Sequence, residues 1–228
     1  MITKQDIFNN QDLFATIVNE KRLSVIPPCD RSYLLHEVEK LPVGATIVEI
    51  GTFVAGTTKC MAEVRPDCKI FSVDINTWNL DDALLSHCKE QWGLAEIDDE
   101  IIHLAQQINT EKFFNVTLVT SKSLDFEIDN IDLLYIDGDH SYDAVLSELR
   151  YYWDKMSCNG IIMGDDVNNN DTYDAVKVFA FEENLEIMIY NKSFKIFKQV
   201  KGYLEPHRET SRLHNLNMFG PQDKLNRP

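Results

Sequence analysis

Short apolar runs that end abruptly in acidic residues recur along this chain. The segment Ile131–Ile136 is apolar except at Asp132, and Asp137, Gly138, Asp139 and His140 follow it directly. The segment Gly160–Gly164 runs in the same way into Asp165 and Asp166. Apolar runs of this length predict strands buried on both faces of a sheet. The carboxyl end of each strand would then bring its polar residues to one edge of that sheet.

The first half of the chain has the same pattern with a glycine loop added. Two more apolar runs, Thr46–Ile50 and Lys69–Val73, predict buried strands, and the second ends at Asp74. Between them lie the loop Gly51–Thr58 and a helix predicted over 59–64. The order strand, glycine loop, helix, strand, acid is the opening half of a Rossmann-like unit. Asp74 stands about 20 residues after Gly51, the offset at which an acid meets ribose hydroxyls.

The remaining pattern predicts an α/β protein with a doubly wound, mostly parallel sheet. A further strand is predicted at 116–120, and helices at 81–92, 97–114, 141–156 and 171–184. The segments 185–190 and 194–197 read as a C-terminal antiparallel hairpin. We expect one domain over 1–200, with accessory helices in 1–40 and a helical insertion or lid in 75–115. The polar tail 201–228 is expected to be mobile or lid-like.

Composition argues against several classes of function. The 228 residues carry 37 acidic and 22 basic side chains, a net charge of −15, which favours neither nucleic acid nor an anionic membrane as partner. Five scattered cysteines fit reduced thiols, and no apolar run has signal-peptide or transmembrane length. We therefore expect a cytoplasmic protein.

The acids at the two later strand ends suggest a cation site. Four neighbouring carboxylates, Asp137, Asp139, Asp165 and Asp166, repel one another unless a positive charge lies among them. Mg²⁺ or Mn²⁺ prefers such oxygen ligands, and we predict Asp137, Asp165 and Asp166 as the ligands. His140 has no second histidine nearby and is predicted to be a catalytic base, with Asp139 as the alternative.

Two nucleotide-binding motifs fit the glycine loop poorly. The spacing Gly51-x-x-x-x-Gly56 resembles a phosphate-binding loop, but Thr57 occupies the place of its lysine, and Lys59 lies inside the next helix. The loop also lacks the G-x-G-x-x-G pattern of dinucleotide-binding proteins.

Three segments together resemble another family. Val48–Thr58, Phe71–Asp74 and Leu134–Tyr142 are similar to the motifs of class I S-adenosylmethionine-dependent methyltransferases, within a region of about 40–200. The resemblance is strongest to the macrocin O-methyltransferase-like group, which includes cephalosporin-hydroxylase-like proteins. It implies that Glu49 and Gly51 line the methionine part of the cofactor and that Asp74 binds its ribose. The full set of predicted cofactor-binding residues is Glu49, Gly51, Thr52, Gly56, Thr57, Asp74, Ser121 and Asp137. Ser121 stands near the adenine position, where many relatives carry an acid.

This resemblance implies a magnesium-dependent O-methyltransferase that uses S-adenosyl-L-methionine. The expected acceptor is a hydroxyl of a sugar or a glycosylated small molecule, such as a natural product. An acid-rich mouth also suits a sulfonium cation electrostatically. Two alternatives remain open, a non-catalytic S-adenosylmethionine-binding module and a hydroxylase-like or nucleotide-using enzyme. Assembly into a homo-oligomer is also left open.

Overall fold

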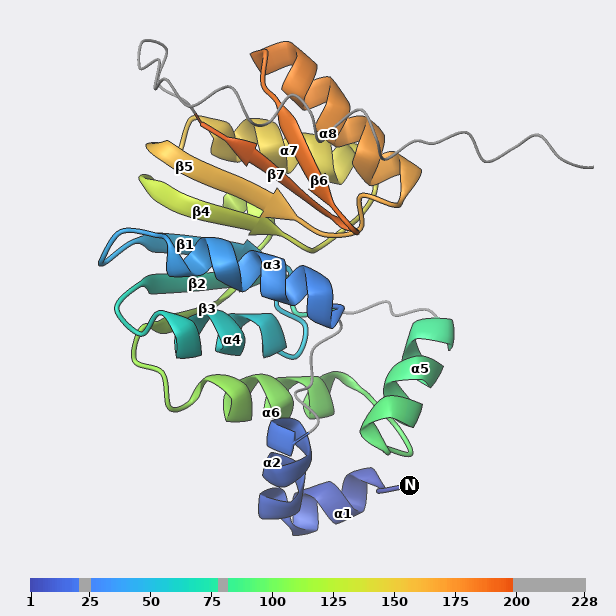
Figure 1. Cartoon of the computed structure of the whole chain (residues 1–228). Helices are drawn as coiled ribbons and strands as arrows, with labels where there is room; N and C mark the ends of the chain where they lie inside the picture. Colours follow the sequence, from blue (N-terminus) through green and yellow to red (C-terminus); the bar gives the residue numbers. More distant parts are fainter. Residues whose placement is uncertain (21–25, 78–81, 199–228) are drawn as a thin grey trace, which may run out of the picture. The chain divides into compact units, whose positions relative to one another are not determined.

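A seven-stranded sheet organises the part of the chain that the structure, a computed structural model, describes: residues 1–20, 26–77 and 82–198 (Figure 1). The strand order is β3-β2-β1-β4-β5-β7-β6. The strands are β1 (Thr46–Ile50), β2 (Lys69–Asp74), β3 (Val116–Thr120), β4 (Ile131–Ile136), β5 (Met156–Gly164), β6 (Ile187–Tyr190) and β7 (Ser193–Phe197). The strands β1 to β5 pair in parallel, and β7 pairs antiparallel with β5 and β6. The predicted doubly wound α/β fold with a C-terminal hairpin is confirmed.

The helices of the described residues are α1 (Lys4–Asn9), α2 (Gln11–Glu20), α3 (Pro28–Glu39), α4 (Gly56–Val64), α5 (Asp82–Trp92), α6 (Asp99–Thr110), α7 (Tyr142–Trp153) and α8 (Asn170–Glu183), with a 3₁₀ turn η1 (Ser123–Asp125). Of these, α3 and α4 pack on one face of the sheet, and α7 and α8 pack on the other. Met1–Lys198 form one compact unit, and the predicted tail 201–228 lies outside the described residues. None of the described helices is both long and apolar enough to span a membrane.

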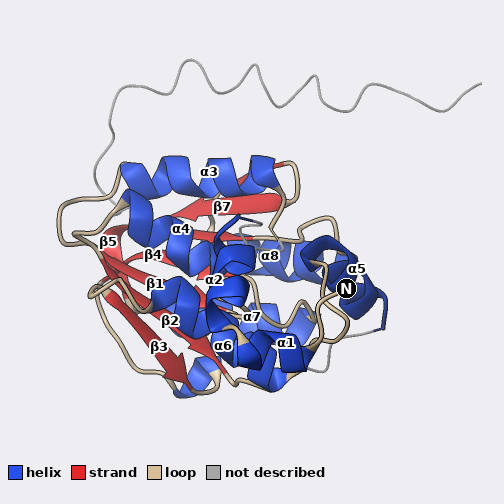
Figure 2. Ribbon diagram, turned by 90° about the horizontal axis from the view of Figure 1, so that it is seen from below, coloured by secondary structure: helices blue, strands red, loops and turns tan. Residues whose placement is uncertain are grey.

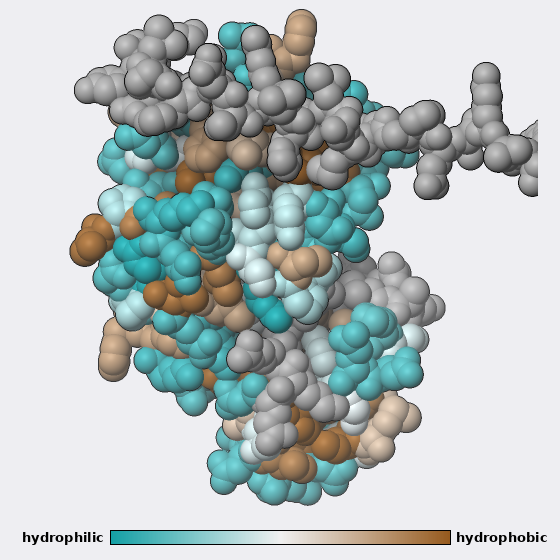
Figure 3. Space-filling model, viewed as in Figure 1, coloured by the Kyte–Doolittle hydropathy of each residue, from teal (hydrophilic) through white to brown (hydrophobic). Residues whose placement is uncertain are grey.

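Alternate side chains of the central strands pack against different pairs of helices, one pair on each face of the sheet. Val48 and Leu134 pack with buried residues of α7 and α8, while Ile47 and Leu133 pack with α3 and α4. This period of two follows from the geometry of a strand, whose successive side chains point to opposite faces. In Figure 1, α3 and α4 lie in front of the sheet and α7 lies behind it. The face that carries α3 is largely hydrophilic, with apolar atoms only in patches (Figure 3).

A separate small core joins the N-terminal helices to the segment between β2 and β3. Phe14 of α2 packs in one cluster with Trp92 of α5 and Ile101 of α6. The helices α1, α2 and α6 lie side by side in both ribbon views (Figures 1 and 2). The accessory helices and the 75–115 segment therefore support each other. Their role as a lid stays a prediction.

Several element boundaries differ from the prediction. The helix α1 was not predicted, because Ile7 is its one buried residue and its start depends on a capping box between Thr3 and Asp6. The helix predicted over 141–156 ends at Trp153, and Met156 already begins β5. The segment 156–160 is partly polar, so its pattern does not predict the first half of this strand.

Strand register brings the predicted site residues into one row. Ile50 of β1 is paired with Val73 of β2 and with Ile136 of β4, and Ile136 is paired with Gly164 of β5. The residues that follow these positions therefore leave the sheet at the same edge. They include Gly51, Asp74, Asp137 and Asp165.

Candidate functional site

The glycine loop crosses the ends of β1 and β4 in direct contact with the β4 backbone. Gly51 has φ +94°, and a Cβ atom built on it would lie 2.1 Å from the carbonyl oxygen of Asp137 and 2.9 Å from Cα of Gly138. The amide of Asp137 donates to the carbonyl of Ile50 at 2.8 Å. Only glycine allows this backbone approach, because every other residue would place a carbon atom in that space.

Asp74 closes the loop from the neighbouring strand. Its Oδ2 accepts hydrogen bonds from the amides of Thr52 (2.9 Å) and Phe53 (3.1 Å), and its Oδ1 accepts one from the amide of Asn76 (2.8 Å). The amide of Ser121, at the end of β3, donates to the Asp74 carbonyl at 3.0 Å. The structure thus brings together Gly51, Thr52, Asp74 and Ser121, and their role in cofactor binding stays a prediction.

Two amide side chains of α6 hold the loop from the other side, and sequence reasoning did not identify them. Gln106 donates to the carbonyl of Phe53 at 2.6 Å, and Asn109 donates to the carbonyl of Val54 at 2.8 Å. Both are buried. The available signal was their spacing of three residues on a helix face that is otherwise apolar.

Glu49 lies inside the protein rather than in an open pocket. Its side chain is 1% exposed, and its Oε2 accepts hydrogen bonds from the hydroxyls of Thr58 and Ser72, the latter at 2.6 Å. Thr57 and Gly56 are also buried, at the start of α4. Burial raises the pKa of Glu49 to about 7. The predicted contact of Glu49 with the methionine part of the cofactor stays a prediction.

The raised pKa of Glu49 predicts that the stability of the protein depends on pH. The pKa of this group is near 4.5 in the unfolded chain and about 7 in the folded protein. The folded state is therefore favoured in acid, where Glu49 is neutral, and this stabilisation is lost as the pH rises between the two values. Glu49→Gln cannot ionise. It should raise the free energy of unfolding by a few kcal/mol at about pH 8, and by much less at about pH 5. Urea unfolding at both pH values measures this, with exposed Glu39→Gln as the control. An equal gain at both pH values would contradict the assignment.

The ends of β4 and β5 form an acidic rim, which we define as Asp137, Asp139, His140, Asp165 and Asp166. Removal from water, together with Asp165 and Glu49, raises the pKa of Asp137 well above its usual range. Burial raises the pKa of Asp165 to about 6, and its Oδ1 is buried without a hydrogen-bond partner. The rim is therefore a place where negative charge is disfavoured unless a cation or donor is supplied.

His140 and Asp139 have different surroundings on this rim. The Nε2 atom of His140 lies 3.3 Å from Oδ2 of Asp166, and both side chains are about one-third exposed. Asp139 accepts a hydrogen bond from the amide of Ser141 at 2.9 Å, at the start of α7. The carboxylate of Asp139 thus binds a backbone amide at the start of α7. The imidazole of His140 lies against the carboxylate of Asp166 and remains accessible.

The acidic rim contains suitable donors for the predicted metal ion. Three carboxylates are suitable ligands for Mg²⁺ or Mn²⁺, and the unpartnered oxygen of Asp165 fits such a role. Within the described ranges, however, no three His, Cys, Asp or Glu side chains are arranged around one point. Asp166 instead contacts His140 and, at 3.9 Å, the ammonium of Lys192. The donor chemistry of the rim fits a divalent cation, and its side chains would have to rearrange to surround one.

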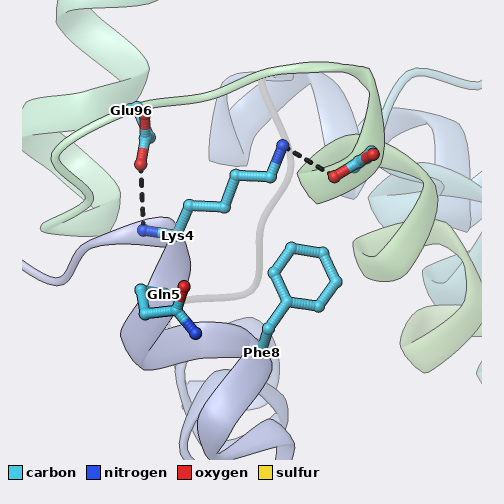
Figure 4. A pocket seen from close by; sticks show the side chains of 5 residues that line it. Lys4, Gln5, Phe8 and Glu96 are labelled. Carbon is cyan, nitrogen blue, oxygen red and sulfur yellow. Dashed lines mark hydrogen bonds and ion pairs between the residues drawn. The ribbon is translucent and has the colours of Figure 1, made fainter.

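A surface hollow elsewhere contains none of the predicted site residues. Lys4, Gln5, Phe8, Glu96 and Glu100 line it, between α1 and the segment before α6 (Figure 4). The Lys4 ammonium is paired with Asp98 and, at 2.7 Å, with Glu100. These ion pairs attach α1 to the α6 start, which is a structural role.

A known protein family and several solved structures are similar to this chain. A family described as "Methyltransferase domain" matches residues 48–167, slightly more than half of the chain, and includes the glycine loop and the acidic rim. The chain belongs to this methyltransferase family. The protein is an S-adenosylmethionine-dependent methyltransferase. A comparison with curated proteins finds no significant match.

Solved structures share the fold of this methyltransferase at low sequence identity. An S-adenosylmethionine-dependent O-methyltransferase from Thermotoga maritima is 15% identical, with a TM-score of 0.51 over 83% of this chain and 72% of that chain. The O-methyltransferase NovP is 15% identical, with a TM-score of 0.57 over 78% of this chain and 82% of that chain. A putative caffeoyl-CoA O-methyltransferase from Staphylococcus aureus is 12% identical, with a TM-score of 0.56 over 85% and 98%.

Proposed function

We propose that the methyltransferase acts on oxygen, transferring the methyl group to a hydroxyl of a sugar or a glycosylated small molecule. The observation that carries this proposal is the contact of Gly51 with the Asp137–Gly138 backbone, which brings the cofactor loop next to the strand end that bears His140. The three solved structures named above are all described as O-methyltransferases, and the motifs resemble those of sugar-modifying members.

The cofactor would lie along the row of strand ends. Gly51, Thr52, Gly56 and Thr57 would line its methionine part beside Glu49, and Asp74 would bind its ribose. Ser121, bonded to the Asp74 backbone, would lie near the adenine. The acidic residues on both sides of the loop favour a ligand that carries a sulfonium cation.

His140 is the proposed base. Its Nε2 atom faces Asp166 at 3.3 Å, and with the ring proton on that nitrogen Nδ1 would keep a lone pair. As the hydroxyl oxygen of the acceptor attacks the methyl carbon, Nδ1 takes the hydroxyl proton. S-adenosylmethionine would supply the methyl group, and the electron pair of its methyl–sulfur bond would remain on sulfur as S-adenosylhomocysteine. Asp166 stabilises the imidazolium that results, and it fixes the ring orientation.

Asp137, Asp165 and Asp166 would hold Mg²⁺ or Mn²⁺ at the rim. Such a cation lowers the pKa of a hydroxyl that it contacts, which would assist the removal of its proton. The buried Asp165 oxygen without a partner and the crowding of three carboxylates support this proposal. Two vicinal oxygens of a sugar would complete the ligand set.

Methyl transfer from labelled S-adenosylmethionine tests this function. A panel of sugars and glycosides with vicinal hydroxyls should accept the label, and derivatives that lack one of the two hydroxyls should accept much less. Chelation of divalent cations should abolish transfer, and added Mg²⁺ should restore it. Transfer to nitrogen or carbon acceptors in preference to hydroxyls would refute the proposed acceptor class. Full activity after chelation would refute the metal requirement alone.

A further inference from the structure

The β6–β7 turn is attached to the rest of the protein through its main chain at Lys192. The Lys192 amide donates to Oδ1 of Asp30 at 3.1 Å, and its carbonyl accepts from the Val167 amide at 2.8 Å. The preceding Asn191 donates to Oδ2 of Asp30 at 2.5 Å. Asp30 itself is fully buried. The turn therefore has a fixed position beside the residues that follow β5, and it does not depend on the Lys192 side chain for it.

From this position, the Lys192 side chain reaches the acidic rim. Its Nζ lies 3.9 Å from Oδ1 of Asp166, whose other oxygen faces His140 at 3.3 Å. The Lys192 ammonium also lowers the pKa of Asp165, against the larger effect of burial. Asp166 thus lies between two nitrogen-bearing side chains, the ammonium of Lys192 and the imidazole of His140.

We propose that Lys192 is a built-in counter-ion that competes with a divalent cation for the carboxylate of Asp166. This inference rests on the proposed metal site of Asp137, Asp165 and Asp166. A cation bound by Asp137, Asp165 and Asp166 would share Asp166 with Lys192, and the Lys192 ammonium repels the incoming ion. In the described part of the chain the three carboxylates do not converge on one point, and Asp166 contacts Lys192 and His140 instead. Lys192 would therefore set the concentration of cation at which the rim fills.

Calorimetric titration with Mn²⁺ and Mg²⁺ alone, without cofactor or acceptor, tests this role. Lys192→Met removes the charge and keeps the main-chain contacts, and it should tighten cation binding roughly tenfold. Lys192→Arg keeps the charge and should bind like the unmodified protein. The matched control is Lys112→Met, because Lys112 has a similar ion pair, 3.7 Å from Glu63 and about half exposed, before β3 at the opposite end of the strands.

Each result bears on the inference. Tighter binding by Lys192→Met alone, or binding that appears only in that variant, supports it. Equal binding by Lys192→Met and the unmodified protein overturns the counter-ion role and leaves the metal site in place. If no variant binds either cation, both the counter-ion and the metal site fail. Methyl transfer, measured separately, would then still decide the proposed O-methyltransferase activity.

Discussion

Replacing Gly51 by alanine should lower the free energy of unfolding by about 3–5 kcal/mol and abolish S-adenosylmethionine binding. Two costs combine at this position. The φ of +94° strains any residue with a Cβ atom, and that atom would lie 2.1 Å from the Asp137 carbonyl oxygen and 2.6 Å from its carbonyl carbon. These are backbone atoms of a central strand end, so they cannot move aside like a flexible side chain. The loop would have to separate from β4 to avoid this clash.

The variant Gly44→Ala separates the cost of backbone strain from the cost of the steric clash. Gly44 has φ +77°, but no atom lies within 4 Å of a Cβ built there. Its replacement should therefore cost only the backbone strain, about 1 kcal/mol, and leave cofactor binding intact. Urea unfolding gives the stabilities, and calorimetry with S-adenosylmethionine gives the affinities. If the two variants lose equal stability, the close contact of Gly51 with β4 is not what requires glycine.

Replacing His140 by alanine should reduce the rate of methyl transfer roughly 10²–10⁴-fold. His140 would accept the hydroxyl proton of the acceptor, and no step of cofactor binding is assigned to it. The affinity for S-adenosylmethionine should consequently stay within a factor of about two, since the loss belongs to the transition state. Initial rates with an acceptor found in the panel, together with calorimetry, measure both quantities.

The control is His36→Ala, which removes an exposed imidazole from α3 and should leave the rate unchanged. Asp166→Asn removes both a proposed ligand of the cation and the carboxylate that faces the imidazole. Its rate should therefore fall at least as much as that of His140→Ala. A loss of less than tenfold in His140→Ala would assign the base to another group, with Asp139 as the first alternative.

The strands and the row of acids at their ends could be predicted because each depends on local sequence. An apolar run such as Thr46–Ile50 identifies a strand buried on both faces, and the polar residue that follows it must leave the sheet at its edge. Parallel pairing then places Asp74, Asp137 and Asp165 on the same edge, without knowledge of side-chain packing.

The supports of the site could not be predicted because they join distant segments. Asp30 holds the β6–β7 turn about 160 residues away, and Gln106 holds the carbonyl of Phe53 across 53 residues. Nothing local identifies the partner of either residue, although the apolar face of α6 around Gln106 is a signal of burial. The burial of Glu49 was likewise hidden, because its partners Thr58 and Ser72 come from two other elements.

The hydrogen bonds of Asp74 have a consequence for how a nucleoside is bound and released. A carboxylate offers about four lone-pair positions, and three are taken by the amides of Thr52, Phe53 and Asn76. One position is left for an incoming sugar, whereas a ribose presents two hydroxyls. If Asp74 binds the ribose as proposed, binding through both hydroxyls would exchange one peptide partner for a ligand partner, so the number of hydrogen bonds at Asp74 would rise by one, not two. On release of the nucleoside, the displaced loop amide would regain its bond to Asp74, which would favour departure of the product.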